Sequence, residues 1–336
     1  MACLSVLFNH TDAAVISITA DGLSKSRIIT LIIYFVCKTA VPLFLMIAGA
    51  NLCGKTDSKA KWYHRIEFIL VTILIISALY HLYYNHAFYW QEYIRNLLTG
   101  ESPLIMWYLY LYLGILLLLP ILQRIQLPKK FYLFLLFLYC IGPGLVPFLD
   151  YYFGVKLISE YILMLQTKPF LLTFLFGHCL ENCMHKKDYS GKGLVIAGIV
   201  AVLSLSFSVG CAIYQMNITG NTFDTTMYGR VFYTPTLLLA TSIFYIVKYI
   251  WMYHEFVRVD RIILQVGSCT FGIYLLGDFL RDFFVGISDY LKSRMPEILS
   301  VLIYDLILFA IGYLIVVFYK CMVTQIKKVK NYQMQE

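Results

Sequence analysis

Runs of apolar residues near the length of a membrane span recur from end to end of the chain, and they constrain its fold more than any other feature. A helix of roughly 20 residues crosses a hydrocarbon core of about 30 Å. Inside that core every backbone polar group needs an internal partner, which a helix supplies within one segment. The sequence therefore predicts an all-α, polytopic membrane helical bundle with about ten transmembrane helices. The predicted spans are residues 1–19, 28–52, 66–88, 104–122, 131–149, 169–183, 194–215, 231–252, 262–280 and 298–319.

The composition excludes an ordinary soluble domain. Hydrophobic residues make up 60% of the 336 residues and charged residues 14%, whereas soluble domains are roughly half apolar and about a quarter charged. The predicted spans follow one another closely, so residues 1–336 are expected to form a single integral-membrane domain. The lipid bilayer is then its first expected partner.

Positive charge is distributed unevenly between the predicted loops. Most Lys and Arg residues lie after the even-numbered spans, as Lys59 and Lys61 do, and fewer lie in the opposite loops, which include Arg95 and Arg281. The positive-inside rule then places both chain termini in the cytoplasm and the loop 89–103 outside. This asymmetry accounts for the net charge of +8, so no nucleic-acid partner is expected.

Ionisable side chains interrupt predicted spans, among them His10 and Asp12 in the first, Lys38 in the second and Asp278 in the ninth. Such residues are costly in a bilayer and are functional candidates by default. The alternatives are structural. His10 can be a histidine bonded to a neighbouring helix, Lys38 can be a counter-ion to Asp12 or Asp278, and Asp278 can be solvated near the outer interface.

The cysteines indicate neither disulfides nor a metal centre. The chain has nine, and none falls in a predicted extracytoplasmic loop, so a disulfide framework is not expected. Cys179 and Cys183 are spaced to share one helix face, and thiolates suit zinc. No second pair of ligands lies nearby in sequence, so no metal site is predicted.

Five segments, spread in order along nearly the whole chain, carry a family resemblance. They are KTAVPLFLMIAGANLCGK (Lys38–Lys55), WYHRIEFIL (Trp62–Leu70), MWYLYLYLGILLLLPIL (Met106–Leu122), FLLTFLFGHCL (Phe170–Leu180) and SCTFGIYLLGDFL (Ser268–Leu280). Together they resemble the signature helices of the membrane acyltransferase-3 family.

The resemblance implies a ten-helix enzyme of the bacterial cell (inner) membrane. Such an enzyme transfers an acetyl or other acyl group from acetyl-CoA to a hydroxyl of a cell-surface glycan or exopolysaccharide. The chemistry of the residues agrees with this activity. A sugar hydroxyl is a poor nucleophile until a base removes its proton, and neutral imidazole, with a pKa of about 6.5, suits that task at neutral pH.

The resemblance also shows where this chain departs from the family. His10 matches the histidine of the family's first helix, but the arginine that precedes it in the family would lie upstream of Met1. The first helix is therefore expected to be truncated at its N-terminus. Ala48 replaces the usual serine before Gly49, and Gly277 stands where many members carry a second histidine.

These observations predict a site with separate roles for its residues. His10 is the expected general base, and Lys38 is expected to stabilise a developing oxyanion. The expected phosphate-binding residues for acetyl-CoA are Lys59, Lys61 and Arg65, although these charges also fit a purely topological role. The expected substrate cavity is lined by Asn9, Trp107, Tyr108, Tyr274 and Asp278.

Two alternatives to the enzyme remain open. A polytopic transporter or glycan flippase also needs many helices, aromatic residues and intramembrane charge, but transporters often carry inverted repeats, and no convincing internal repeat is found. The second alternative is a degenerate, non-catalytic member of the family, because the arginine upstream of His10 is missing.

Overall fold

The computed structural model describes residues 2–11, 25–54, 57–100, 106–125, 127–155, 170–219, 223–224, 231–254 and 257–333. These residues form helices and connecting turns, and no strand occurs among them. The chain divides into two compact units, each built from separated stretches of sequence. Unit 1 comprises Met1–Leu45, Phe134–Phe170 and His185–Glu336, and unit 2 comprises Met46–Leu133 and Leu171–Met184. The expected single domain stays a prediction.

Within the described ranges, six helical stretches are long and apolar enough to cross a membrane, which confirms a helical, multi-pass membrane protein. Five of them coincide with predicted spans of similar extent, and the sixth, Lys59–Asn85, begins earlier than the predicted span 66–88. Their apolar character follows from the runs seen in the sequence. The six are Arg27–Leu52, Lys59–Asn85, Lys129–Phe153, Gly191–Thr219, Tyr233–Tyr253 and Glu297–Ile326.

The remaining four predicted spans have shorter or bent counterparts. Predicted spans 104–122 and 169–183 appear as the short apolar helices Trp107–Leu122 and Phe170–Cys183, and 262–280 appears as two helices bent by 56° at a break. Predicted span 1–19 begins as α1 (Ala2–His10), and its residues 12–19 lie outside the described part of the chain. Ten spans therefore remain a prediction.

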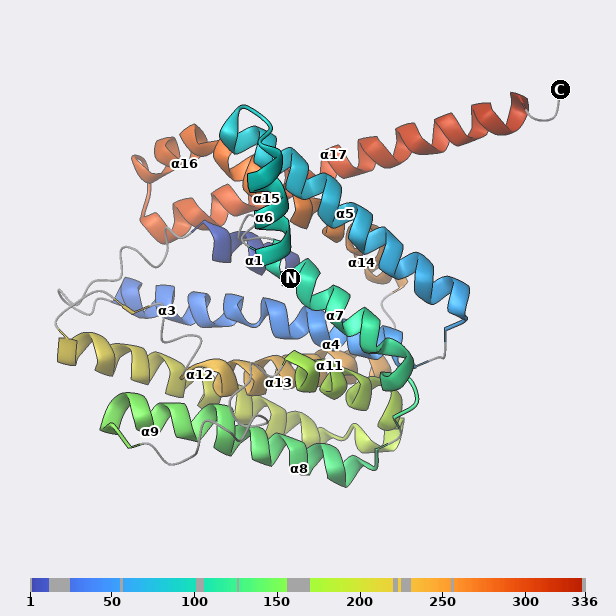
Figure 1. Cartoon of the computed structure of the whole chain (residues 1–336). Coiled ribbons are helices and arrows are strands. Elements are labelled where there is room, and N and C mark those ends of the chain that lie inside the picture. The colour runs from blue at the N-terminus through green and yellow to red at the C-terminus, as the bar shows by residue number, and fades with distance from the viewer. Residues whose placement is uncertain are drawn as a thin grey trace. The chain divides into compact units, whose positions relative to one another are not determined.

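Unit 1 contains most of the long helices. In it α12 and α13 run side by side, and α17 packs against α1, α15 and α16 (Figure 1). The helices wholly within unit 1 are α1 (Ala2–His10), α3 (Lys25–Lys38), α9 (Val146–Phe153), α12 (Gly191–Thr219), α13 (Tyr233–Tyr253), α14 (Val257–Gly267), α15 (Thr270–Phe283), α16 (Val285–Lys292) and α17 (Glu297–Gln333).

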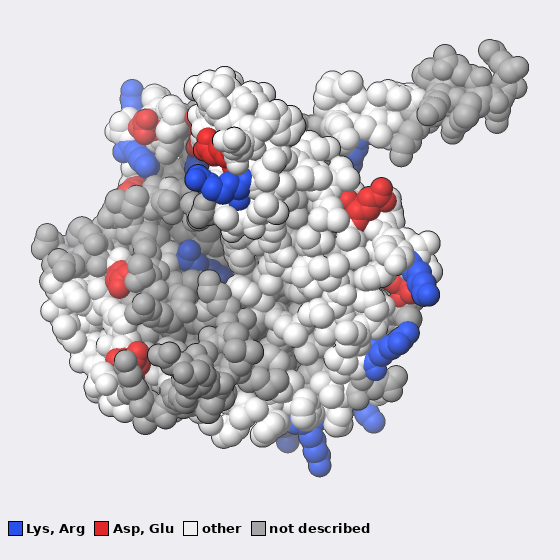
Figure 2. Space-filling view, in the orientation of Figure 1, with Lys and Arg blue, Asp and Glu red and all other residues white. Residues whose placement is uncertain are grey.

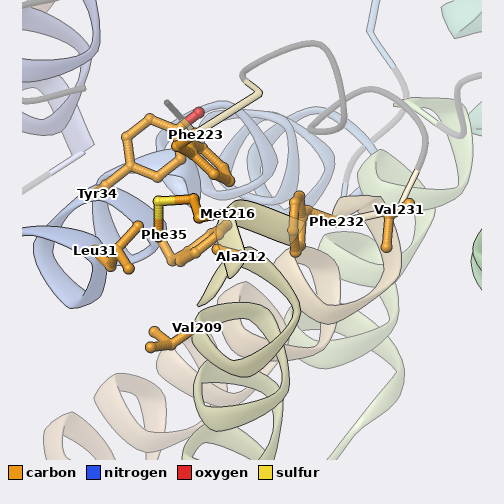
Figure 3. Close-up of a cluster of buried hydrophobic side chains, with 9 residues drawn as sticks. All are labelled: Leu31, Tyr34, Phe35, Val209, Ala212, Met216, Phe223, Val231 and Phe232. Carbon is orange, nitrogen blue, oxygen red and sulfur yellow. The ribbon is translucent and has the colours of Figure 1, made fainter. Parts of the chain in front are cut away.

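Helix α3 is held in unit 1 by an aromatic cluster. Tyr34 and Phe35 of α3 pack edge-on against Phe223, and Phe35 also meets Phe232. Figure 3 shows these rings beside Met216 of α12, with the side chains directed toward one another. Aromatic pairs of this kind contribute about 0.5–1.5 kcal/mol each beyond the area they bury. The cluster therefore fixes the helix that ends at Lys38.

The second predicted span breaks in the middle for a reason visible in the sequence. Pro42 has no N–H to donate to the carbonyl of Lys38, so the helical ladder is interrupted there. Thr39 turns back instead, and its backbone N–H and its hydroxyl both donate to the carbonyl of Val36. Helix α3 consequently ends at Lys38, and α4 (Ala40–Leu52) begins two residues later.

Unit 2 is built around α5 (Lys59–Asn85), α7 (Trp107–Leu122) and α11 (Phe170–His178), together with most of α4. Helices α4 and α11 approach so closely that a Cβ on Gly49 would lie 1.8 Å from the carbonyl oxygen of Phe174. A Cβ on Gly177 would lie 1.9 Å from that of Met46. Small residues of this kind let membrane helices meet backbone to backbone.

One segment that the sequence analysis treats as a loop is largely helical. Helix α6 (Trp90–Thr99) occupies most of residues 89–103 and packs against α5. Its Tyr93 hydroxyl donates to the carbonyl of Leu74, which lies well inside α5. The predicted loop therefore returns along the helix that precedes it.

The remaining helices link these parts. α8 (Lys129–Tyr139) starts in unit 2 and continues into unit 1, where a π-helical turn at Cys140–Leu145 follows it. A second π-helical turn, Cys179–Cys183, extends α11, and a 3-10 turn occupies Lys186–Asp188.

Candidate active site

His10 is the last residue of α1, a short helix enclosed by other helices of unit 1. Helix α1 contacts α3, α15 and α17. Its buried side chains include Phe8, which packs with Cys37 of α3 and Val301 of α17. The helix ends at His10, and the hydroxyl of Thr11 caps it by donating to the carbonyl of Phe8. The imidazole is therefore held by an element whose position is set by tertiary packing.

A carboxylate and a guanidinium of α15 meet the end of α1. Nδ1 of His10 lies 3.8 Å from Oδ1 of Asp278, and Nη1 of Arg281 lies 3.1 Å from the same oxygen. Arg281 Nη1 also donates to the backbone carbonyl of His10 at 2.9 Å. His10, Asp278 and Arg281 thus form a connected group, named the His10 cluster below.

The environment of Asp278 contradicts one alternative left open by the sequence. Its side chain is only 5% exposed and is ion-paired, so it is not a solvated carboxylate at the interface. Asp278 and Arg281 are three residues apart on α15, and this spacing places them on one helix face. Tyr274, four residues before Asp278, is also buried on α15, and its place in the substrate cavity stays a prediction.

Arg281 is the residue that the sequence analysis missed. The sequence places it among the positive charges of an outer loop, but it lies in the last turn of α15 and contacts Asp278 and His10. Its own carbonyl accepts a hydrogen bond from the hydroxyl of Tyr304 at 2.7 Å. The signal that could have found it is an acid near the end of a predicted span, followed three residues later by a base just beyond that end.

Asn9 and Lys38 belong to the neighbouring turns of α1 and α3. Asn9 Nδ2 donates to the carbonyl of Cys37 at 2.9 Å, so the residue next to His10 is bonded to the residue next to Lys38. Lys38 is half-buried, and its Nζ lies 4.7 Å from the centroid of the Tyr34 ring. A cation over an aromatic face is partly compensated for the loss of water.

The three predicted phosphate-binding residues lie in unit 2, at the beginning of α5. Figure 2 shows charged atoms of both signs gathered there. Asp57, which the sequence analysis did not consider, is 6% exposed and lies 3.0 Å from Lys61 Nζ and 3.4 Å from Arg65 Nε. Lys59 is exposed. Part of the positive charge predicted for phosphate binding is therefore already neutralised by a buried carboxylate.

Trp107 and Tyr108, the remaining predicted cavity residues, also belong to unit 2. They are the first two residues of α7, and their ring centroids are 6.1 Å apart. Tyr108 also stacks on Tyr112. The structure thus places Asn9, His10, Lys38, Tyr274 and Asp278 in unit 1. The cavity that these residues were expected to share with Trp107 and Tyr108 stays a prediction.

No cluster of three or more His, Cys, Asp or Glu side chains with metal-binding geometry occurs in the described part of the chain. Cys183 Sγ lies 3.8 Å from His178 Nε2, and Asn182 contacts the other ring nitrogen of His178. These contacts join the last turn of α11 to the π-helical turn that follows it.

The comparisons with known proteins agree with the resemblance found in the sequence. A family model described as an acyltransferase domain, that of the acyltransferase-3 family, matches residues 1–326. No curated protein and no solved structure matched the chain in the corresponding searches. The match covers almost the whole chain and includes all three residues of the His10 cluster, so this multi-pass membrane protein belongs to the acyltransferase-3 family.

Proposed function

We propose that this protein transfers an acetyl group from acetyl-CoA to a hydroxyl of a cell-surface glycan or exopolysaccharide, with His10 as general base. The family supports acyl transfer in a membrane. The observation that carries the finer proposal is the His10 cluster, in which an imidazole at the end of a packed helix meets a buried carboxylate. Acetyl-CoA and the glycan are substrates of this reaction.

The geometry suits an imidazole that accepts a proton. As the hydroxyl oxygen attacks the thioester carbonyl, its proton passes to His10, and the same proton then leaves with the sulfur of coenzyme A. The positive charge on the imidazole during this step is stabilised by the Asp278 carboxylate. The distance of 3.8 Å is longer than a hydrogen bond, and catalytic contacts often shorten when substrate binds.

Arg281 acts as a positioning residue in this proposal. It holds the Asp278 carboxylate and the backbone of His10 at the same time. Movement of α1 relative to α15 would break the bond from Arg281 to the His10 carbonyl and separate the imidazole from Asp278. Positioning matters because a displacement of about 1 Å can lower a rate by roughly 10²-fold.

We assign the donor's phosphates to Lys59, Lys61 and Arg65. The residues fit a polyanion only in part, because Asp57 already shares Lys61 and Arg65. Lys59 and the strongly exposed Lys61 are the side chains best able to turn toward a phosphate. Lys38 is proposed to stabilise negative charge on the thioester oxygen, since Asn9 bonds the residue that precedes it.

We place the protein in the bacterial cell membrane with both termini in the cytoplasm, on the basis of the loop charges. In intact cells, a single cysteine at His86 in a cysteine-free background is expected to react with a membrane-impermeant thiol reagent. A single cysteine at Lys59 is expected not to react. The reverse pattern would overturn the orientation.

The test of the activity is the acetyl content of surface polysaccharide in cells that carry His10→Ala. We expect loss of the acetyl ester with normal amounts of protein in the membrane, because the proton acceptor is removed. His64→Ala is the matched control, since His64 is an exposed histidine on α5. Acetylation near the wild-type level in His10→Ala would remove His10 from the mechanism.

A further inference from the structure

Asp305 is a buried carboxyl group that the proposed mechanism does not use. It lies in α17 and is 1% exposed. Neither of its carboxyl oxygens has a hydrogen-bond partner among the described residues, and no ion pair joins it to another described side chain. The sequence criterion that selected Asp278, an acid within an apolar run, applies equally to Asp305.

The surroundings of Asp305 are helical and mostly apolar. On the same face of α17, Val301, Tyr304 and Leu308 are all buried. Val301 packs with Phe8 of α1 and Cys37 of α3. Asp305 therefore lies where α17 meets the two helices that carry His10 and Lys38.

Charged and titratable groups lie near Asp305 on the helices that surround this part of α17. The thiol of Cys37 on α3 is within hydrogen-bonding range of Ser5 and within electrostatic range of both Asp305 and Lys38. The hydroxyl of Tyr304 has electrostatic interactions with Asp305 and with charged groups of α15 and α16. The groups to be considered are Cys3 and His10 on α1, Cys37 and Lys38 on α3, Asp278, Arg281 and Asp282 on α15, Asp289 on α16, and Tyr304.

Asp278 provides an internal standard for judging Asp305. Both are aspartates buried in the same set of helices, but Asp278 has Arg281 at 3.1 Å and His10 at 3.8 Å. A carboxylate that lacks both a cation and hydrogen-bond donors is strongly disfavoured in a protein interior and takes up a proton instead. The membrane interior increases that preference.

A second buried atom near Cys37 also lacks a donor. Asn9 Oδ1 has no hydrogen-bond partner among the described residues, while Asn9 Nδ2 donates to the Cys37 carbonyl. Exchanging the two amide atoms would turn the oxygen toward that carbonyl, so the assignment shown is the favourable one. This region therefore has more acceptors than donors, and a proton on Asp305 would supply one donor.

We propose that Asp305 is a proton-binding site in the interior of unit 1, a neutral carboxylic acid separate from Asp278, which is paired with Arg281 in the His10 cluster. The site binds a proton rather than a metal cation. Because the carboxyl group is protonated, a hydrophobic carbodiimide is expected to modify it.

The proposal predicts a distinct chemical reactivity. A carboxylic acid adds across one C=N bond of a carbodiimide. The oxygen bonds to the central carbon, the proton moves to nitrogen, and no group leaves. An oxygen-to-nitrogen shift of the acyl group then gives a stable N-acylurea. An ionised carboxylate brings no proton of its own and reacts far more slowly.

The experiment treats the full-length protein in membranes with dicyclohexylcarbodiimide at neutral pH and maps the adduct by mass spectrometry. We expect an N-acylurea on Asp305, at least tenfold more than on Asp278, and its loss in Asp305→Asn. Asp278→Asn is the matched control and should leave the adduct on Asp305. An unmodified Asp305, or equal modification of both residues, would overturn the proposal.

Two further measurements separate a proton from other occupants. Infrared spectra should show a carboxylic-acid carbonyl band in the wild type that Asp305→Asn lacks, and a carboxylate band in its place would contradict the proposal. Labelling should be equal in sodium and choline buffers at one pH, because protection by sodium would assign the site to a cation. Neither readout depends on acyl transfer, so these results stand apart from the proposed function.

Discussion

Each unit of the molecule contains a buried aspartate that faces two cationic or imidazole groups, yet the two arrangements differ in what they can do. Asp278 in unit 1 meets His10 and Arg281 from within a helix, and Asp57 in unit 2 meets Lys61 and Arg65 just before one. The exposed fractions of the two carboxylates are nearly equal, at 5% and 6%. Burial of an acid beside bases therefore does not by itself identify an active site.

The difference lies in the partners and in what fixes them. Asp57 precedes Ser58, which caps α5, and an acid at a helix N-terminus is stabilised by the helix dipole. Its partner Lys61 is 61% exposed, as expected for a flexible side chain at a helix end. Asp278 contacts the imidazole of His10, a group that can exchange protons near neutral pH. His10 lies on α1, which is held by α3, α15 and α17. We therefore propose that Asp57 anchors the start of α5 and that Asp278 takes part in the chemistry.

The largest expected effect is that of Asp278→Asn. The amide keeps the shape of the side chain but cannot stabilise an imidazolium, so turnover should fall by about 10²-fold or more. The measurement is acetyl transfer by purified protein in lipid vesicles, with the amount of folded protein as control. Activity within threefold of the wild type would make Asp278 as dispensable as Asp57 is expected to be.

Lys38→Met is expected to have the next largest effect. Loss of a group that stabilises the oxyanion typically lowers turnover by about 10²-fold, while the KM for the donor should change little. If Lys38 were only a structural counter-ion, an apolar residue in its place would be mild or even stabilising. Steady-state kinetics with varied acetyl-CoA distinguish the two cases.

Arg281→Ala should lower turnover by roughly tenfold, because it removes charge-assisted bonds worth about 1.5–3 kcal/mol that hold the cluster together. Arg281→Lys should restore part of the activity, since an ammonium group can reach one of the two acceptors. Equal activity of the two variants would show that Arg281 does not position His10.

The smallest effect is expected for Asp57→Asn, with turnover changed by less than about threefold. Ion pairs with exposed partners contribute roughly 0–1 kcal/mol, and the amide can still accept hydrogen bonds from Lys61 and Arg65. The KM for acetyl-CoA is the sensitive readout, because this change releases positive charge near the proposed phosphate site. A tenfold loss of turnover would erase the distinction between the two clusters.

The sequence predicted the helices better than the contacts between them. Long apolar runs are a property of one segment, and six of them are confirmed as helices of spanning length. The same reasoning selected His10 and Asp278 because an ionisable residue in a span is costly. It could not show that the two residues meet, because periodicity does not tell which helices are neighbours. The contact from Arg281 to His10, for example, joins residues 271 positions apart.

Two errors have definite physical causes. Arg281 was read as a loop charge because the span was expected to end at residue 280, one residue before it, whereas α15 extends to Phe283. Asp57 lies in a predicted loop, where an acid carries no insertion cost and so gives no signal of burial, although an acid four residues before Lys61 is a standard ion-pair spacing. In both cases the sequence shows that a charged residue is present but does not show which residue it pairs with.

The most direct test of the central claim is a double-mutant cycle of His10→Ala and Asp278→Asn, measured as acetyl transfer to a glycan acceptor in vesicles. Residues that act as one unit show strongly non-additive effects. We expect the double variant to be no slower than His10→Ala alone, since the carboxylate has no imidazolium left to stabilise. Losses that multiply in the double variant would contradict the account and show that Asp278 acts independently of His10.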